Sequence, residues 1–291
     1  MIDRGIDHLV LCVHDLDKAR AFYEQLGFTC TPRALHPWGT GNTLVQLQGN
    51  FIEVLAILDP AKLAPAAPGQ FDFGRFNAEY LKKRQGFAML VFQSKDARAD
   101  HAEFKMNGLD SYAPFDFERQ AKLPDGSSAR VAFSLAFATD KRMPEAAFFC
   151  CQQHAPQYFW KPEYQKHANG ARVVGEVVMR APDPAAMRDF FGTLQGFGSV
   201  ETAPGRLDVR TALGAVTLLD RQRIAERYPD MTLPGPTDSP ILVGYRVDVA
   251  DIGAAEKLLR ANNVAARRHR DRLIVDPADA FGVAIEFAQS R

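Results

Sequence analysis

The chain has 291 residues, 46% of them hydrophobic, and its 35 basic and 35 acidic residues give a formal net charge of zero. This length fits two ordinary domains better than one. The balanced charge offers no electrostatic basis for binding nucleic acid or an anionic membrane. No apolar run is long enough for a membrane helix, and the first residues lack a signal-peptide pattern, so the sequence predicts a soluble, cytoplasmic protein.

The first predicted unit begins with an apolar strand, HLVLCV at residues 8–13, which leads into a helix. Asp15 is a favourable N-cap for the segment LDKARAFYEQLGF, in which apolar residues recur at helical spacing as far as Gly27. The β-rich stretches TLVQLQ and FIEVLAI follow. This order predicts a strand, a helix and then about three strands.

The same pattern returns along the chain. It is clear at residues 176–197, where Asp183 is the expected cap and Pro184 the first helical residue, and at 243–264, and it is fainter at 86–109. Four βαβββ units predict an α+β fold with two domains, because pairing two units shields the open face of each sheet and forms a cleft.

The expected N-terminal domain covers residues 1–154, with units at about 5–58 and 86–154, and the expected C-terminal domain covers 171–291. Residues 155–170 form the predicted connector. Its aromatic side chains would be costly to leave in water, so we expect it to pack on a domain rather than act as a flexible linker.

Two residues of the first unit suggest a metal site. His8 lies in the first strand, and Glu53 lies between Ile52 and Val54 in the last strand. A buried carboxylate needs a partner, which His8 and a metal ion would supply. An alternative remains open, in which strand alternation turns Glu53 to solvent and His8 is an ordinary core histidine hydrogen-bonded to the backbone.

The second unit offers His154 at the polar end of its last strand, AAFFCCQQH. With His8 and Glu53 it would complete a set of two histidines and one carboxylate. The alternative is a surface histidine at a strand end. The position that corresponds to His8 in this unit is Ala88 or Met89, and neither binds a metal through its side chain.

The C-terminal units carry Glu176 and Glu286 but have Thr217 and Gly244 at the other matched positions. We therefore expect the C-terminal cleft to be degenerate and to lack a metal.

The segment HPWGTGN, residues 36–42, is predicted to be a hairpin tip at the mouth of the first cleft. Its glycines permit a positive φ, and Asn42 can hydrogen-bond to backbone or ligand. Trp38 and Asn42 are the predicted substrate-binding residues, and His36 joins Glu53 as a predicted acid or base. The alternative for Trp38 is a structural contact that holds the hairpin to the domain.

The run DHLVLCVHDLDKARAFYEQLGF, followed by a glutamate in the last strand, resembles the vicinal oxygen chelate superfamily of paired βαβββ modules. HPWGTGN with GNFIEVLA, and FFCCQQHAP leading to HANGA, are similar to its glyoxalase-like branch over about residues 5–171. The resemblance implies a divalent metal bound by first-strand and last-strand residues, and a substrate that chelates it. His8 and Glu53 fall on ligand positions, whereas Ala88 or Met89 departs from them.

The leading hypothesis is therefore a metal-dependent glyoxalase-like enzyme with lyase, isomerase or dioxygenase chemistry on a small oxygen-chelating substrate. Its ion would be Zn, Ni, Fe or Mn, with Glu53 as a ligand or the base. The alternative function is a metal-free protein that binds a small molecule in the same cleft, as resistance proteins of the superfamily do. A homodimer is left open as the quaternary structure.

Overall fold

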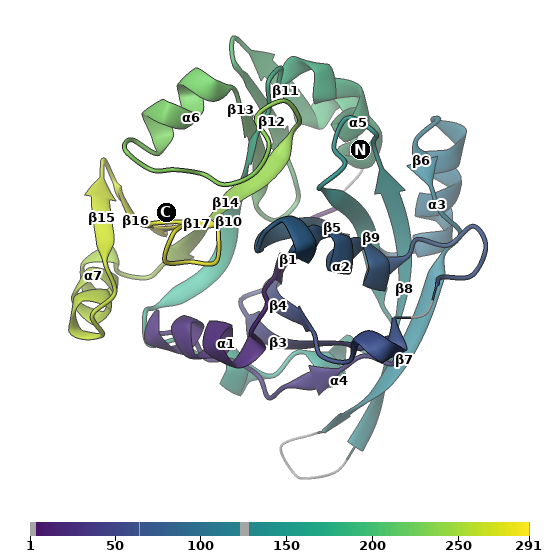
Figure 1. Ribbon diagram of the computed structural model, residues 1–291, viewed down its shortest axis with the longest axis horizontal. Helices are drawn as coiled ribbons and strands as arrows, with labels where there is room; N and C mark the ends of the chain where they lie inside the picture. The colour runs from purple at the N-terminus through teal and green to yellow at the C-terminus, as the bar shows by residue number, and fades with distance from the viewer. Residues whose placement is uncertain (1–3, 64, 123–127, 291) are drawn as a thin grey trace.

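The computed structural model describes residues 4–63, 65–122 and 128–290. Its strands form two mixed sheets, one from each half of the chain (Figure 1). The first has nine strands in the order β2-β3-β4-β1-β5-β9-β8-β6, with β7 paired to β8, and the second has eight in the order β11-β12-β13-β10-β14-β17-β16-β15. No helix among the described residues is long and apolar enough to cross a membrane.

The first sheet is built from two units joined by a helix. Its strands are β1 (Ile6–Cys12), β2 (Ala34–Leu35), β3 (Thr40–Gln46), β4 (Phe51–Ile57), β5 (Gly86–Gln93), β6 (Asp110–Ser111), β7 (Phe115–Lys122), β8 (Ser128–Thr139) and β9 (Ala147–Gln153). The helices are α1 (Leu16–Gln25), α2 (Phe73–Lys83) and α3 (Ala97–Met106), with a 3₁₀ turn at Pro60–Lys62. The sequence analysis did not predict α2, which connects the units.

The second sheet repeats this arrangement. Its strands are β10 (Ala171–Arg180), β11 (Val200–Ala203), β12 (Arg206–Arg210), β13 (Ala215–Leu219), β14 (Ile241–Val249), β15 (Ala266–His269), β16 (Arg272–Val275) and β17 (Ala284–Gln289). The helices are α5 (Arg188–Gln195), α6 (Arg221–Arg227) and α7 (Ile252–Ala261), with 3₁₀ turns at Ala185–Met187 and Phe197–Ser199. The predicted α+β fold of four βαβββ units is confirmed.

Aspartate caps begin three of the four unit helices, and the predicted cap Asp15 is one of them. The carboxylates of Asp15, Asp96 and Asp251 accept hydrogen bonds from backbone N–H groups in the first turns of α1, α3 and α7. The third unit differs, because Asp183 accepts its hydrogen bond from the N–H of Ala185 in a 3₁₀ turn. Its α-helix therefore begins later than the sequence pattern predicts.

The segment between the two sheets packs on the first one. It contains a short helix, α4 (Pro156–Phe159), and a 3₁₀ turn at Pro162–Gln165. The Gln46 side chain donates to the backbone oxygen of Phe159 at 2.9 Å, and His167 Nε2 lies 2.8 Å from the Gln46 backbone oxygen. These contacts hold the buried Phe159 ring against the sheet.

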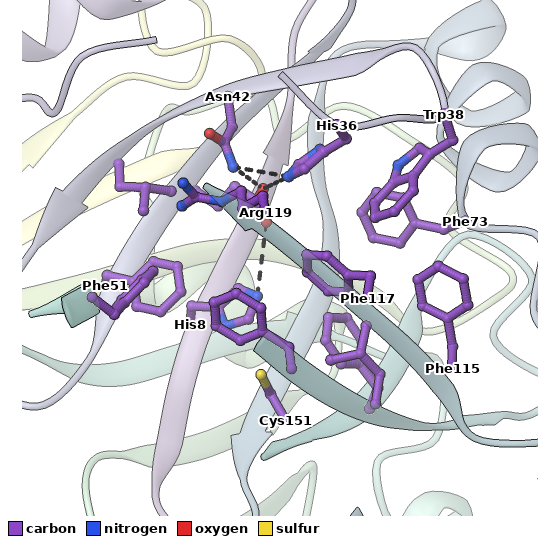
Figure 2. Close-up of a pocket in the computed structure, with 16 residues that line it drawn as sticks. His8, His36, Trp38, Asn42, Phe51, Phe73, Phe115, Phe117, Arg119 and Cys151 are labelled. Atoms are coloured by element: carbon purple, nitrogen blue, oxygen red, sulfur yellow. Dashed lines mark hydrogen bonds and ion pairs between the residues drawn. The ribbon is translucent and has the colours of Figure 1, made fainter. Parts of the chain in front are cut away.

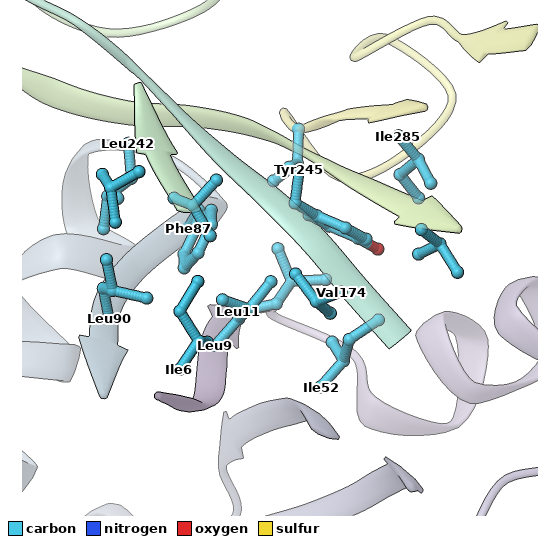
Figure 3. Close-up of a cluster of buried hydrophobic side chains, with 14 of the residues drawn as sticks. Ile6, Leu9, Leu11, Ile52, Phe87, Leu90, Val174, Leu242, Tyr245 and Ile285 are labelled. Carbon is cyan, nitrogen blue, oxygen red and sulfur yellow. The ribbon is translucent and has the colours of Figure 1, made fainter. Parts of the chain in front are cut away.

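Strand pleating divides the side chains of β1 between two environments. Leu9 and Leu11 enter a core shared by both sheets, where they lie with Tyr245 of the C-terminal half (Figure 3). Val10 and Cys12 point to the other face, into a separate apolar cluster rich in phenylalanine. The shared core thus fixes which face of the first sheet remains available for a ligand.

Candidate active site

A cavity lies on the face of the first sheet opposite the shared core. Seven of its sixteen lining residues are phenylalanines, which come from β4, β7, β8, β9, α2 and α4 (Figure 2). Its polar side chains are concentrated in one group, His8, His36, Asn42, Glu53 and Arg119. An apolar cavity with a few convergent polar groups is the usual form of a small-molecule site.

Glu53 is the central residue of this group. Its neighbours Ile52 and Val54 enter the shared core, so the pleat of β4 directs Glu53 to the cavity, where it is only 6% exposed. Asn42 Nδ2 donates to Glu53 Oε1 at 2.6 Å. The alternative in which Glu53 faces solvent therefore does not describe the structure.

His8 is held on both sides of its ring. Its Nδ1 lies 2.6 Å from Asp7 Oδ1, and its Nε2 lies 3.7 Å from Glu53 Oε2. The ring also stacks on Phe51, with 4.3 Å between the ring centroids. Gln153 Nε2 donates to the second oxygen of Asp7 at 3.0 Å. This chain of contacts fixes the imidazole with Nε2 directed to the carboxylate.

His36 approaches Glu53 from the hairpin side. Its Nδ1 lies 2.7 Å from Thr40 Oγ1, and its Nε2 lies 3.4 Å from Asn42 Nδ2 and 4.0 Å from Glu53 Oε1. Burial lowers the pKa of His36 below its usual 6.5, although the charge of Glu53 opposes this change. A neutral ring that donates from Nδ1 and accepts at Nε2 satisfies both neighbours.

Arg119 and its strand were missed by the sequence analysis. Along β7 the side chains alternate, so that Phe115, Phe117 and Arg119 line the cavity while Asp116 is exposed. Burial lowers the pKa of Arg119, and the charge of Glu53 acts to raise it. The alternating letters FDFER at residues 115–119 were the available signal for this strand.

Residues 36–39 form the predicted hairpin tip between β2 and β3, whereas residues 40–42, which were predicted to belong to the tip, are the first residues of β3. Trp38 lines the cavity and stacks on His36 with 4.9 Å between ring centroids, and the rings of Phe115 and Phe117 contact it edge-on. Gly39 has φ +84, and a Cβ there would lie 2.2 Å from the backbone oxygen of Asp59. Close packing therefore requires glycine at this turn.

Two polar atoms of the cavity lack partners among the described residues. Trp38 Nε1 and Asn42 Oδ1 are buried without a hydrogen bond. Buried polar atoms are usually paired, so a donor and an acceptor in the same cavity are available to a ligand.

His154 does not join this group. It is exposed at the end of β9, where its Nε2 lies 2.8 Å from Ser134 Oγ, and it does not line the cavity. The structure therefore brings His8 and Glu53 together but leaves the third predicted ligand outside. Cys151, three residues earlier, does line the cavity, and burial raises the pKa of its thiol well above 9.0.

The second unit contributes apolar side chains where the first has ionisable ones. β1 pairs Val10 with Glu53 in parallel, and β5 pairs Val91 with Phe149 in the same way, so Phe149 corresponds to Glu53. By the same correspondence Met89, which is fully buried, matches His8. Among the described residues, no group of three or more His, Cys, Asp or Glu side chains is arranged to hold a metal ion.

In the second sheet, the strand carboxylates Glu176 and Glu286 are both paired with an arginine. Arg227 of α6 donates to Glu176 at 2.8 Å and to Glu286 at 2.7 Å, and Arg246 and Arg272 each donate to one of these carboxylates. Burial opposes ionisation of Glu176, but the hydrogen bonds and positive charge of Arg227 outweigh it, and the pKa falls to about 2. The carboxylates of the C-terminal cleft are thus paired with arginines in one ion-pair network.

The paired βαβββ units and the cleft in the first sheet define a vicinal oxygen chelate fold. Within that superfamily the chain belongs to the glyoxalase-like family, since the family model described as "Glyoxalase-like domain" matches residues 6–194. A comparison with curated protein sequences finds no match.

Solved structures resemble the chain over nearly its whole length. A hypothetical protein from Staphylococcus aureus matches with a TM-score of 0.68 at 12% identity, over 99% of this chain and 100% of that one. A mutant 4-hydroxymandelate synthase from Streptomyces coelicolor gives 0.57 at 16% identity, over 99% and 93%. A Mn(II)-bound glyoxalase from Novosphingobium aromaticivorans gives 0.58 at 11% identity, over 99% and 82%. At these identities the likeness shows the fold.

Proposed function

We propose that the cavity of the first sheet is the active site of a glyoxalase-like enzyme that moves a proton on a small, flat substrate bearing an oxygen group. The observation that carries this proposal is Glu53, a carboxylate 6% exposed among aromatic rings. Burying a carboxylate is costly, and the pairing of Glu53 with Asn42 and two histidines is the kind of environment in which catalytic acids and bases occur.

The proposed roles follow from the contacts. Glu53 lines the cavity and accepts the proton from the substrate. His8 Nε2 lies 3.7 Å from Glu53 Oε2, where it is positioned to stabilise the Glu53 side chain before and after this transfer. His36 and Asn42 orient the carboxylate from the hairpin side. The unpartnered Trp38 Nε1 and Asn42 Oδ1 would receive the polar atoms of the substrate, while the phenylalanine rings would cover its flat body.

Trp38 gives a test of the cavity as a ligand site. Trp38→Ala is expected to weaken binding of a flat ligand by about 2 kcal/mol or more, because it removes an aromatic anchor from the lining. Binding should be measured by titration calorimetry with a panel of catechols and methylglyoxal adducts. The exposed Phe197, replaced by alanine, is the control and should leave affinity unchanged.

The structural alternative for Trp38 predicts a different result. If its packing on Phe73, Phe115 and Phe117 is its only role, the thermal midpoint of the ligand-free variant falls steeply while affinity per folded molecule stays the same. These two results together would show that Trp38 has only a structural role in the hairpin.

A divalent metal at the same site is the second candidate, and one observation favours it. Asp7 holds His8 Nδ1 at 2.6 Å, as second-shell carboxylates hold metal-binding histidines, and leaves Nε2 directed at Glu53. An ion held there would polarise a substrate oxygen. Against it, the described residues supply two protein donors where catalytic zinc sites use three, and Arg119 brings a cation to the same carboxylate.

Metal content tests this candidate separately. If the metal candidate is right, the wild type retains about one ion per chain after metal-free purification and reloading with Zn, Ni, Fe or Mn, and the His8→Ala, Glu53→Ala double variant loses it. His154→Ala, outside the cavity, is the matched control and should keep the ion. Equal metal content in the wild type and the double variant would reject the metal and leave the proton-transfer proposal standing.

Metal-free ligand binding is the remaining alternative. The aromatic lining that suits a substrate suits a sequestered ligand equally, so turnover decides between them. The Glu53 variant described in the Discussion makes that distinction.

A further inference from the structure

A second cavity adjoins the proposed active site. The two cavities share four lining residues, Asn42, Leu44, Arg119 and Phe159. One end of a bound molecule could therefore lie in the aromatic cavity while the other extends past Arg119. We call the second space the outer cavity.

The outer cavity differs from the aromatic one in charge. Its described lining contains the cations Arg33, Arg119 and Lys161 and no aspartate or glutamate. The three come from separate parts of the chain, the loop before β2, strand β7, and the segment that follows α4. Arg33 has one ion pair among the described residues, with Asp17 at 3.7 Å, and both of those side chains are largely exposed, so that pair neutralises little of its charge.

Arg119 lines both cavities, and Figure 2 shows its side chain among those of the aromatic one. Burial disfavours its charged form, and Glu53 on the inner side compensates only part of that cost. An anion in the outer cavity would offset the rest of the cost of burying the Arg119 charge, because guanidinium groups bind carboxylate, sulfonate and phosphate oxygens through paired hydrogen bonds.

We propose that the substrate of this site combines a flat apolar body, held in the aromatic cavity, with an anionic group held in the outer cavity by Arg33, Arg119 and Lys161. The inference rests on the proposed function and narrows its substrate to aromatic or similarly flat organic anions. It also assigns the two peripheral cations, Arg33 and Lys161, to substrate selection rather than to the reaction.

Naphthalene probes of matched size test the proposal. 2-Naphthoate carries the anionic group, 2-acetylnaphthalene is its neutral counterpart, and 2-naphthyl phosphate carries a phosphate at the same ring position. Binding is measured by calorimetry and by quenching of tryptophan fluorescence, to which Trp38 of the aromatic cavity contributes. The wild type is expected to bind the better of the two anions about tenfold more tightly than the neutral probe. The ratio between naphthoate and the phosphate identifies the preferred anion.

The decisive variant is Arg33→Gln with Lys161→Gln. It should weaken anion binding about tenfold and leave affinity for 2-acetylnaphthalene unchanged, because neither side chain lines the aromatic cavity. The matched control, Lys95→Gln with Arg221→Gln, removes the same charge from exposed positions outside both cavities and should change neither affinity.

The outcomes separate this inference from the proposed function. If all three probes bind equally, or if the control variant weakens the anions as much as the outer-cavity variant, the inference is overturned while the aromatic cavity remains a ligand site. If no probe binds and Trp38→Ala changes nothing with the wider ligand panel, the proposed function fails, and this inference fails with it.

Discussion

Replacing Arg227 with methionine is expected to lower the free energy of unfolding by about 3 to 5 kcal/mol at pH 7. Arg227 donates to both Glu176 and Glu286, which are 6% and 0% exposed. Methionine keeps much of the side-chain volume but removes the charge, so two buried carboxylates lose their shared partner. Urea denaturation followed by circular dichroism measures the change, and Arg221→Met, an exposed position on the same helix, is the control.

The pH dependence provides a second measurement of the same network. The pKa of Glu176 is about 2 in the folded protein against a reference of 4.5. Because the folded-state value is depressed, the ionised carboxylate stabilises the wild type above about pH 4.5, and that contribution, about 3 kcal/mol, is lost as the pH falls towards 2. In Arg227→Met this loss should be much smaller, since the carboxylate no longer has its main partner.

Removing the carboxylates as well should restore stability. The triple variant Arg227→Met, Glu176→Gln, Glu286→Gln buries no unpaired carboxylate and is expected to be more stable than Arg227→Met alone. If Arg227→Met unfolds at the same urea concentration as Arg221→Met, the network contributes nothing measurable and this account of the C-terminal cleft is wrong.

Glu53→Gln is expected to lower kcat by about 10² to 10⁴ on any substrate that the ligand panel identifies. Glutamine keeps the length of the side chain and an acceptor for Asn42, so the fold and ligand affinity should change little, whereas the base is lost. Initial rates and calorimetry on the same preparation separate the two effects. Glu118→Gln, an exposed carboxylate on β7, is the matched control.

Rates decide between the enzyme and the binding protein. A Glu53→Gln rate within a factor of about three of the wild type would remove Glu53 from proton transfer. If the wild type binds ligands from the panel but turns none over, the metal-free binding function becomes the better description of the cavity.

The arrangement of the unit helices and sheets was predictable because it depends on local patterns. Aspartate caps and apolar residues at helical spacing recur in register, and Asp15 caps its helix where the sequence indicates it. The third unit shows the limit of such patterns. Asp183 caps a 3₁₀ turn, and because this turn comes first, the α-helix α5 begins only at Arg188.

Only part of the candidate site could be predicted from the sequence. His8 and Glu53 stand on strands of one unit, β1 and β4, which pair directly, so their approach follows from the order of the unit. Which way Glu53 pointed could not be decided, because alternation gives two faces and does not say which is buried. The second sheet decides it, since the shared core takes Ile52 and Val54 and leaves Glu53 to the cavity.

The sequence by itself determined the repeated unit, the aspartate caps and the pair His8 and Glu53, because each depends on residues within one unit. Only the tertiary structure placed Arg119 beside Glu53, directed His154 away from the cavity, and put Arg227 between Glu176 and Glu286. The positions of Arg119 and Arg227 depend on β7 and α6, which the sequence did not predict, and on contacts between residues more than 50 positions apart, such as Arg227 and Glu176. His154 is placed by its contact with Ser134 of the neighbouring strand β8. Packing of whole elements sets such contacts, and no local hydrogen-bonding or hydrophobic periodicity encodes them.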